Sequence, residues 1–218
     1  MYFQRLTATI ASLLLALVLS PSAEADLDGD ILQLQQRWAE VNYQLKGKTQ
    51  ITEFETLIEA AANVTDKYPE AAAAWIWSGI IKSTYAGAKG GLGALKMAKK
   101  SKADLEKAME LDADALQGSA YTSLGTLYFS VPGWPVGFGD DAKAEELLLH
   151  ALAVNPDGID PNYFYGDFLS RQKRYPESKT YLLKAQAAPP RPNRQVADAG
   201  RQKEISQALL EIEKHLEK

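Results

Sequence analysis

Small residues recur at a fixed spacing along the chain, and this constrains the fold more than any other feature of the sequence. Between residues 160 and 192, Gly166 belongs to one helical segment and Ala185, 19 residues later, belongs to the next. Ser178 and Leu182 lie on the second segment, and prolines follow it. Small side chains allow two helices to approach closely, and a proline ends a helix. The spacing predicts an antiparallel helix pair as the unit from which the chain is built.

Two further copies of this unit precede it once insertions are allowed. Gly125 and Ala151 lie 26 residues apart, and Gly79 and Ala108 lie 29 residues apart, so these copies are 7 and 10 residues longer. Both insertions fall between the first and the second helix of the unit. Residues 72–192 are therefore expected to form three units, and about three is the minimum that stacked repeats need to bury a continuous core.

The rest of the chain also has helical periodicity, and no segment alternates with period two for long enough to indicate a strand. Apolar residues at three- and four-residue steps predict a helix pair over residues 26–71, which is a degenerate fourth unit. A last helix over residues 193–218 is expected to cap the stack with a polar outer face. The predicted fold is an all-α solenoid of antiparallel helix pairs.

The first 25 residues are typical of a secretory signal peptide. One basic residue, Arg5, precedes an uncharged run over residues 6–19, and the segment ends in Ala23-Glu24-Ala25. The run is shorter than the roughly 20 residues that a membrane helix needs. No cysteine follows the run to carry a lipid anchor. We therefore expect cleavage after Ala25 and a periplasmic protein that is not a lipoprotein and has no integral membrane segment.

Reactive side chains are scarce, which bears on function. The chain has no cysteine and only two histidines, so thiolate chemistry is excluded and metal binding or acid–base catalysis is disfavoured. A formal net charge of −4 offers no basic footprint for nucleic acid. We expect no enzymatic activity, no cofactor, no metal and no nucleic-acid partner.

The repeat spacings over residues 72–192 resemble those of the tetratricopeptide repeat (TPR) superfamily. More narrowly, the second unit resembles the T-component proteins associated with TRAP-type solute transporters. That resemblance is carried by Leu124-Gly125, residues 132–135, residues 138–140, Lys143-Ala144, Asn155-Pro156 and residues 159–165. It implies an exported helical scaffold that works beside a periplasmic solute-binding protein. The lipid-anchoring cysteine that such proteins often carry is absent from this sequence.

In a TPR array the first helix of each pair lines a concave surface that binds partners. Tyr163 and Asp167 are expected to offer hydrogen bonds there to an extended peptide or a helix. The alternative is that some groove positions pack against the neighbouring repeat or the C-terminal helix. The surface lacks the clustered lysines and arginines with which other repeat proteins bind a C-terminal carboxylate. The repeat register predicts the following groove positions: Ile76, Ile80, Ser83, Thr122, Thr126, Phe129, Tyr163, Asp167 and Ser170.

Two glycine-rich segments are expected to form loops. In residues 132–141, two prolines and three glycines hold Trp134 and Phe138 either for display as rigid binding anchors or for packing between the helices. Asp140 is expected to cap the next helix. Residues 86–93 are expected to form an inserted loop at the rim of the groove.

Three functions are compatible with these features. The leading hypothesis is a non-enzymatic periplasmic scaffold that binds a protein partner, with a periplasmic solute-binding protein of a TRAP-type uptake system as one candidate. The second is a transport accessory that binds a small apolar or anionic solute between its helices. The third is a homo-oligomeric assembly module.

Overall fold

The structure is a computed structural model that describes residues 21–217. The predicted signal peptide lies mostly outside these residues, but helix α1 begins within it, at Pro21. Within the described residues the chain forms helices without a strand, which confirms the all-α prediction. The helices are α1 (Pro21–Gln44), α2 (Gly47–Lys67), α3 (Ala72–Lys89), α4 (Gly91–Asp112), α5 (Ala115–Ser130), α6 (Asp141–Val154), α7 (Ile159–Arg171), α8 (Tyr175–Ala187) and α9 (Gln195–Leu216).

The same close contact recurs in each of the pairs α3/α4, α5/α6 and α7/α8. It lies at the glycines on which the repeat spacing is based. On the first helix of each pair, an added β-carbon would meet the side chain of a buried leucine on the second helix. Only glycine therefore allows the helices to pack at this separation. The distances from an ideal β-carbon to the leucine Cγ are 2.6 Å for Gly79 and Leu105, 2.9 Å for Gly125 and Leu148, and 2.8 Å for Gly166 and Leu182.

Buried serines join the same contact in two of the pairs. The Ser101 hydroxyl on α4 donates to the Gly79 carbonyl over 2.7 Å, and the Ser178 hydroxyl on α8 donates to the Gly166 carbonyl over 2.6 Å. Neither serine is exposed. A small side chain on the second helix thus completes the close approach with a hydrogen bond.

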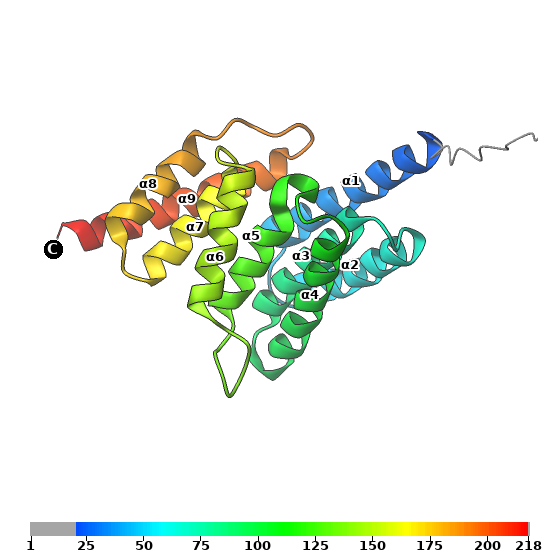
Figure 1. Cartoon of the computed structure of the whole chain (residues 1–218), viewed down its shortest axis with the longest axis horizontal. Coiled ribbons are helices and arrows are strands. Elements are labelled where there is room, and N and C mark those ends of the chain that lie inside the picture. The colour runs from blue at the N-terminus through cyan, green and yellow to red at the C-terminus, as the bar shows by residue number, and fades with distance from the viewer. Residues whose placement is uncertain (1–20, 218) are drawn as a thin grey trace, which may run out of the picture.

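The two predicted insertions have different structures. The expected loop over residues 86–93 is wrong, because α3 continues to Lys89 and α4 begins at Gly91. Gly90 alone breaks the helix, with φ of 62°, a value that favours glycine. The ten additional residues therefore lengthen the two helices. The second insertion is a loop, residues 131–140, that projects from one end of the molecule between α5 and α6 (Figure 1).

The odd-numbered helices close into a ring. Each of α1, α3, α5 and α7 contacts the next odd-numbered helix, as expected for stacked pairs, and α9 also contacts α1. In Figure 1, α9 runs from the neighbourhood of α1 back along α7 and α8. The C-terminal helix therefore covers the last repeat and in addition joins the two ends of the array.

The contact between α1 and α9 is narrow and specific. An ideal β-carbon at Gly200 on α9 would lie 2.4 Å from the Tyr43 ring on α1. The Tyr43 hydroxyl lies 3.2 Å from the Glu204 carboxylate. The core cluster that holds Trp38, Phe54 and Trp77 includes Ala197 of α9. The first three helices and α9 therefore share one hydrophobic core.

Candidate functional site: the interior of the helical ring

The ring encloses a cavity of about 580 Å³, which we call the ring cavity. Every helix of the ring contributes to its wall, and the segment 188–194 covers it. Aromatic side chains of α1, α3 and α7 supply the apolar part of the wall, namely Trp38, Trp77 and Phe164. The volume lies in the range of small-molecule sites.

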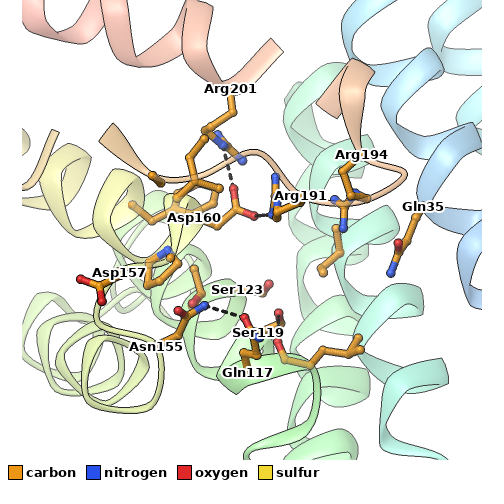
Figure 2. Close-up of a pocket in the computed structure, with 18 of the residues that line it drawn as sticks. Gln35, Gln117, Ser119, Ser123, Asn155, Asp157, Asp160, Arg191, Arg194 and Arg201 are labelled. Atoms are coloured by element: carbon orange, nitrogen blue, oxygen red, sulfur yellow. Dashed lines mark hydrogen bonds and ion pairs between the residues drawn. The ribbon is translucent and has the colours of Figure 1, made fainter. Parts of the chain in front are cut away.

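A partly buried ion-pair network forms one side of the cavity, with Arg201 as its most buried member. The Asp160 carboxylate at the start of α7 accepts from Arg191 Nη1 over 2.6 Å and from Arg201 Nε over 2.9 Å (Figure 2). Arg191 also pairs with Asp198 at 2.7 Å, and Arg201 with Glu204 at 2.6 Å. Each of these two arginines is therefore shared between two carboxylates.

The network holds Asp160 in its charged form. Burial alone would raise the pKa of Asp160, but the positive charges of Arg201 and Arg191 outweigh burial and lower its pKa to about 2. Arg201 also lies over the Tyr163 and Phe164 rings, 4.3 and 4.4 Å from their centroids. The network thus fastens α9 and the segment 188–194 to α7.

Polar side chains form the opposite side of the cavity. Gln117, Ser119 and Ser123 come from α5, and Asn155 follows α6 (Figure 2). Asn155 Nδ2 donates to Gln117 Oε1 over 3.0 Å. Leu116 and Gln117 have φ of 49° and 58°, in the left-handed region that non-glycine residues rarely adopt. This strained kink at the start of α5 turns the segment along the cavity.

A second hollow adjoins the ring cavity and shares Ile80, Ser123 and Phe164 with it. We call it the apolar groove; its volume is about 560 Å³. Side chains around the α3–α4 junction and the end of α5 line it, mostly small or aliphatic, together with Pro132 and Val136 of the loop.

The loop over residues 131–140, here the Trp134 loop, is held by its own backbone. Gly139 N donates to the Pro132 carbonyl over 3.0 Å, and Val136 N donates to the Gly133 carbonyl over 3.1 Å. Phe138 packs edge-on against Tyr128, with ring centroids 5.6 Å apart. Trp134 does not pack back between the helices, because 90% of its surface is exposed. The Asp140 side chain accepts from Lys143 N over 3.0 Å, which confirms the predicted cap.

The predicted groove residues divide into three sets. Thr122 lines the ring cavity, Ser83 and Thr126 line the apolar groove, and Ile80 lines both. The prediction for Ile76 is wrong: this side chain is fully buried, because it packs with Ala108 and Ala120 between α3, α4 and α5.

The third set packs between helices beside the two hollows. The Phe129 ring lies 5.7 Å from Phe168 and 4.8 Å from the Arg171 guanidinium, and Asp167 pairs with Arg171 at 3.3 Å. Tyr163 packs under Arg201. Ser170 is half-buried near the end of α7 and lines neither hollow. For Phe129 and Tyr163 the alternative of packing against the next repeat or the C-terminal helix describes the structure.

The arginines of the ring cavity did not emerge from the repeat pattern. Arg191 and Arg194 lie between α8 and α9, and Arg201 lies on α9, within the predicted cap. The only local signal is the proline- and arginine-rich stretch over residues 189–194. Ring closure, which the sequence pattern does not encode, brings this stretch over the first helices.

Comparison with known proteins bears on the fold. No family model matches the chain, and no curated protein sequence matches it. Among solved structures, a thermophilic TPR protein from Thermus thermophilus is similar with a TM-score of 0.56 at 15% identity, over 84% of this chain and 99% of that one. This chain has the TPR fold. PilF of Pseudomonas aeruginosa is also similar, with a TM-score of 0.36 at 13% identity, over 86% of this chain and 90% of PilF.

The TPR fold agrees with the repeat spacings read from the sequence and confirms the predicted solenoid. In this chain α9 and the segment 188–194 contribute to the wall of the ring cavity, and α9 contacts both α1 and α7. The narrower resemblance to T-component proteins stays a prediction. Within residues 21–217 no helix is long and apolar enough to span a membrane.

Proposed function

We propose that the protein is an exported, non-enzymatic TPR scaffold that binds a protein partner through the Trp134 loop and the apolar groove beside it. TPR folds serve as interaction scaffolds because stacked helix pairs present extended surfaces. The proposal depends on one observation above all, the exposed indole of Trp134.

Trp134 has the properties of an interface anchor. Its side chain is 90% exposed on a loop whose backbone is fixed by internal hydrogen bonds and by the packing of Phe138. Val136, 63% exposed, stands next to it and lines the apolar groove. A rigid exposed tryptophan loses little freedom on binding, and tryptophans are enriched among the residues that dominate interface energy. This surface fits a partner with an apolar segment.

The place and the system are also part of the proposal. The leader over residues 1–25 supports export to the periplasm, and cleavage after Ala25 would leave residues 26–44 of α1, including Asp30, whose carboxylate pairs with Lys67 of α2 at 2.9 Å. The resemblance of residues 124–165 to T-component proteins supports a solute-binding protein of a TRAP-type uptake system as the partner.

Site-specific photo-crosslinking in intact cells tests the proposal. A photoreactive phenylalanine analogue replaces Trp134 in one strain and Leu210 in a control strain, because Leu210 is also an exposed apolar residue (62%) but lies on α9. We expect a discrete adduct from position 134 alone, weakened by Val136→Asp, with a solute-binding protein identified in it by mass spectrometry.

The possible results separate the parts of the proposal. A position-134 adduct with a different envelope protein would support the scaffold and overturn the TRAP assignment. Equal adducts from positions 134 and 210, or none from either, would overturn the scaffold proposal. A purified mature chain that does not begin at Asp26, or a protein confined to the cytoplasm, would overturn the export proposal.

A further inference from the structure

The ring cavity has a cationic group that the protein itself does not neutralise. Three arginines line the cavity, Arg191, Arg194 and Arg201, against two carboxylates, Asp157 and Asp160. Asp160 is already shared between Arg191 and Arg201, as described above. Within residues 21–217, the Arg194 side chain makes no ion pair, and its Nε is buried with no hydrogen-bond partner.

The surroundings of Arg194 oppose its charge. The guanidinium lies over the Trp77 ring, 5.2 Å from the centroid. Burial lowers the pKa of Arg194, and the nearby charge of Arg191 lowers it further, while Asp160 and Asp198 attract it only from beyond ion-pair distance. An arginine stays protonated in proteins, so a half-buried guanidinium without a partner is costly unless an anion joins it.

A second unpartnered donor lies in the same place. Trp77 is 4% exposed, lines the cavity, and its Nε1 is buried without a hydrogen-bond partner among the described residues. Trp38, the neighbouring indole, differs, because its Nε1 donates to Thr84 Oγ1 over 3.0 Å. A buried N–H without an acceptor costs free energy. Arg194 and Trp77 thus place two hydrogen-bond donors without acceptors in contacting side chains, and one of the two side chains is cationic. This combination favours a negatively charged ligand with several hydrogen-bond acceptors.

We propose that the ring cavity binds a small organic monocarboxylate, whose carboxylate pairs with Arg194 and the Trp77 indole and whose apolar body lies against Trp38 and Phe164. Of the three arginines that line the cavity, Arg194 is the one without an ion-pair partner among residues 21–217. A planar guanidinium suits a single carboxylate. The aromatic wall favours an apolar body over inorganic phosphate. Gln117 and Ser119 on the opposite side offer hydrogen bonds to a polar substituent (Figure 2).

The anchor residue of this site differs from that of the protein-binding surface proposed above, although the two hollows share Ile80, Ser123 and Phe164. Trp134 lines neither hollow, and Arg194 lines the ring cavity alone. Loss of partner binding on substitution of Trp134 and loss of carboxylate binding on substitution of Arg194 are therefore independent results.

Calorimetry and thermal unfolding of the purified protein test the inference. The probes are benzoate, phenylacetate and 3-phenylpropionate, with the neutral amide of each acid and inorganic phosphate for comparison. We expect at least one acid to raise the melting temperature of the protein. Its amide should bind at least about tenfold more weakly, because it lacks the charged carboxylate and a hydrogen bond to a charged group is worth about that factor. This comparison uses the unaltered protein and does not depend on the folding of a variant.

Variants then locate the binding. Arg194→Gln should weaken binding of the acid about tenfold or more. Trp77→Phe, which keeps an aromatic side chain but removes the N–H donor, should weaken it about fivefold. Arg171→Gln is the matched control, because Arg171 also lies over an aromatic ring, that of Phe129, but outside the cavity. It should leave binding unchanged.

Three results would overturn the inference. The first is the absence of binding by all three acids, and the second is equal binding of acid and amide. The third is equal binding by the Arg194→Gln and unaltered proteins. Stabilisation by phosphate as strong as that by the best acid would overturn the carboxylate assignment.

Discussion

At the scale of single residues, the contact between Gly166 and Leu182 limits how α7 and α8 pack. We expect Gly166→Ala to destabilise the protein by about 1–2 kcal/mol, because the overpacking cost of roughly 1–3 kcal/mol exceeds the helix propensity that alanine gains. Leu182 is fully buried and has little room to move away from a new methyl group 2.8 Å from its Cγ. Urea unfolding measures the change.

Gly87→Ala is the control for this prediction. Gly87 is also a helical glycine, but an added β-carbon there meets nothing within 4 Å. This substitution should stabilise the protein by about 0.5–1 kcal/mol through helix propensity alone. If both substitutions stabilise the protein, the close contact between α7 and α8 does not depend on glycine.

Asp160 is expected to make stability depend on pH in acid. Its pKa is lowered from 3.8 to about 2 in the folded protein, so its contribution is present above pH 4 and is lost as the pH falls towards 2. Asp160→Asn should cost about 3 kcal/mol near neutral pH, because Arg201 and Arg191 lose a shared carboxylate. Below pH 4 the variant should lose less stability than the unaltered protein.

Chemical unfolding at a series of pH values between 2 and 7 measures both effects. Asp157→Asn is the control, because Asp157 also lines the ring cavity but is exposed. It should behave as the unaltered protein does. Parallel pH curves for Asp160→Asn and the unaltered protein would contradict the role given to the ion-pair network.

At the scale of elements, the position of α9 depends on its approach to α1 at Gly200. A β-carbon there would lie 2.4 Å from the Tyr43 ring, so Gly200→Ala should push the two helices apart and cost about 1–3 kcal/mol. Because the chain has no cysteine, a spin-label pair at Gln44→Cys and Lys203→Cys reports the distance between α1 and α9 without interference. We expect a narrow distance distribution in the parent and a broader one in the variant.

Gly29→Ala on α1 is the control, because nothing lies within 4 Å of a β-carbon at that position. It should leave the distance distribution unchanged and stabilise the protein by about 0.5–1 kcal/mol through helix propensity alone. An unchanged distribution in the Gly200→Ala protein would show that α9 is held elsewhere.

The same elements show what sequence reasoning can reach. The helix pairs were predictable because Gly79, Gly125 and Gly166 leave a local signature, a small residue at a constant distance from its partner. The Asp140 cap was predictable for the same reason, since it depends on residues three apart. Even so, the glycines near residue 90 suggested a loop, because the sequence does not show which of them takes a left-handed φ.

The interior of the ring was not predictable in this way. Arg194 meets Trp77 and Tyr43 meets Glu204 across more than 100 residues, and no period relates the members of these pairs. The prediction placed Ile76 in the groove, although its side chain is fully buried. On a helix, residues of the core face and of the groove face alternate within a single turn, so the repeat register alone does not separate them. Whether an apolar side chain lies in the core or in the groove depends on how the next pair rotates.

At the scale of the whole molecule, ring closure should make unfolding cooperative. In an open solenoid each repeat contacts only the neighbouring repeats, so the repeats unfold partly independently of one another. Here Ala197 of α9 belongs to the same core as α1, α2 and α3. We expect a single transition in scanning calorimetry with equal calorimetric and van't Hoff enthalpies. Hydrogen exchange should protect α1 and the first half of α9 to the same free energy.

Deletion of residues 195–218 should convert this transition into a broader one, in which the N-terminal pairs outlast α7 and α8. The deletion removes Arg201, the α9 residue that pairs with Asp160. It also exposes Ile159 and Ala185, which pack against Ile205 of α9. A deleted protein that still unfolds in one sharp transition would contradict the stabilising role of ring closure.

Ring closure also fixes how many repeats the protein can have. An open array tolerates the duplication or loss of a helix pair, because the end of the stack simply moves. In this chain the end of the stack must return to its beginning, and one pair more or fewer would carry Gly200 away from Tyr43 by the width of a whole unit. Insertions and deletions are therefore confined to lengths within a pair, as in the longer helices α3 and α4 and the Trp134 loop, while the number of pairs is conserved by geometry.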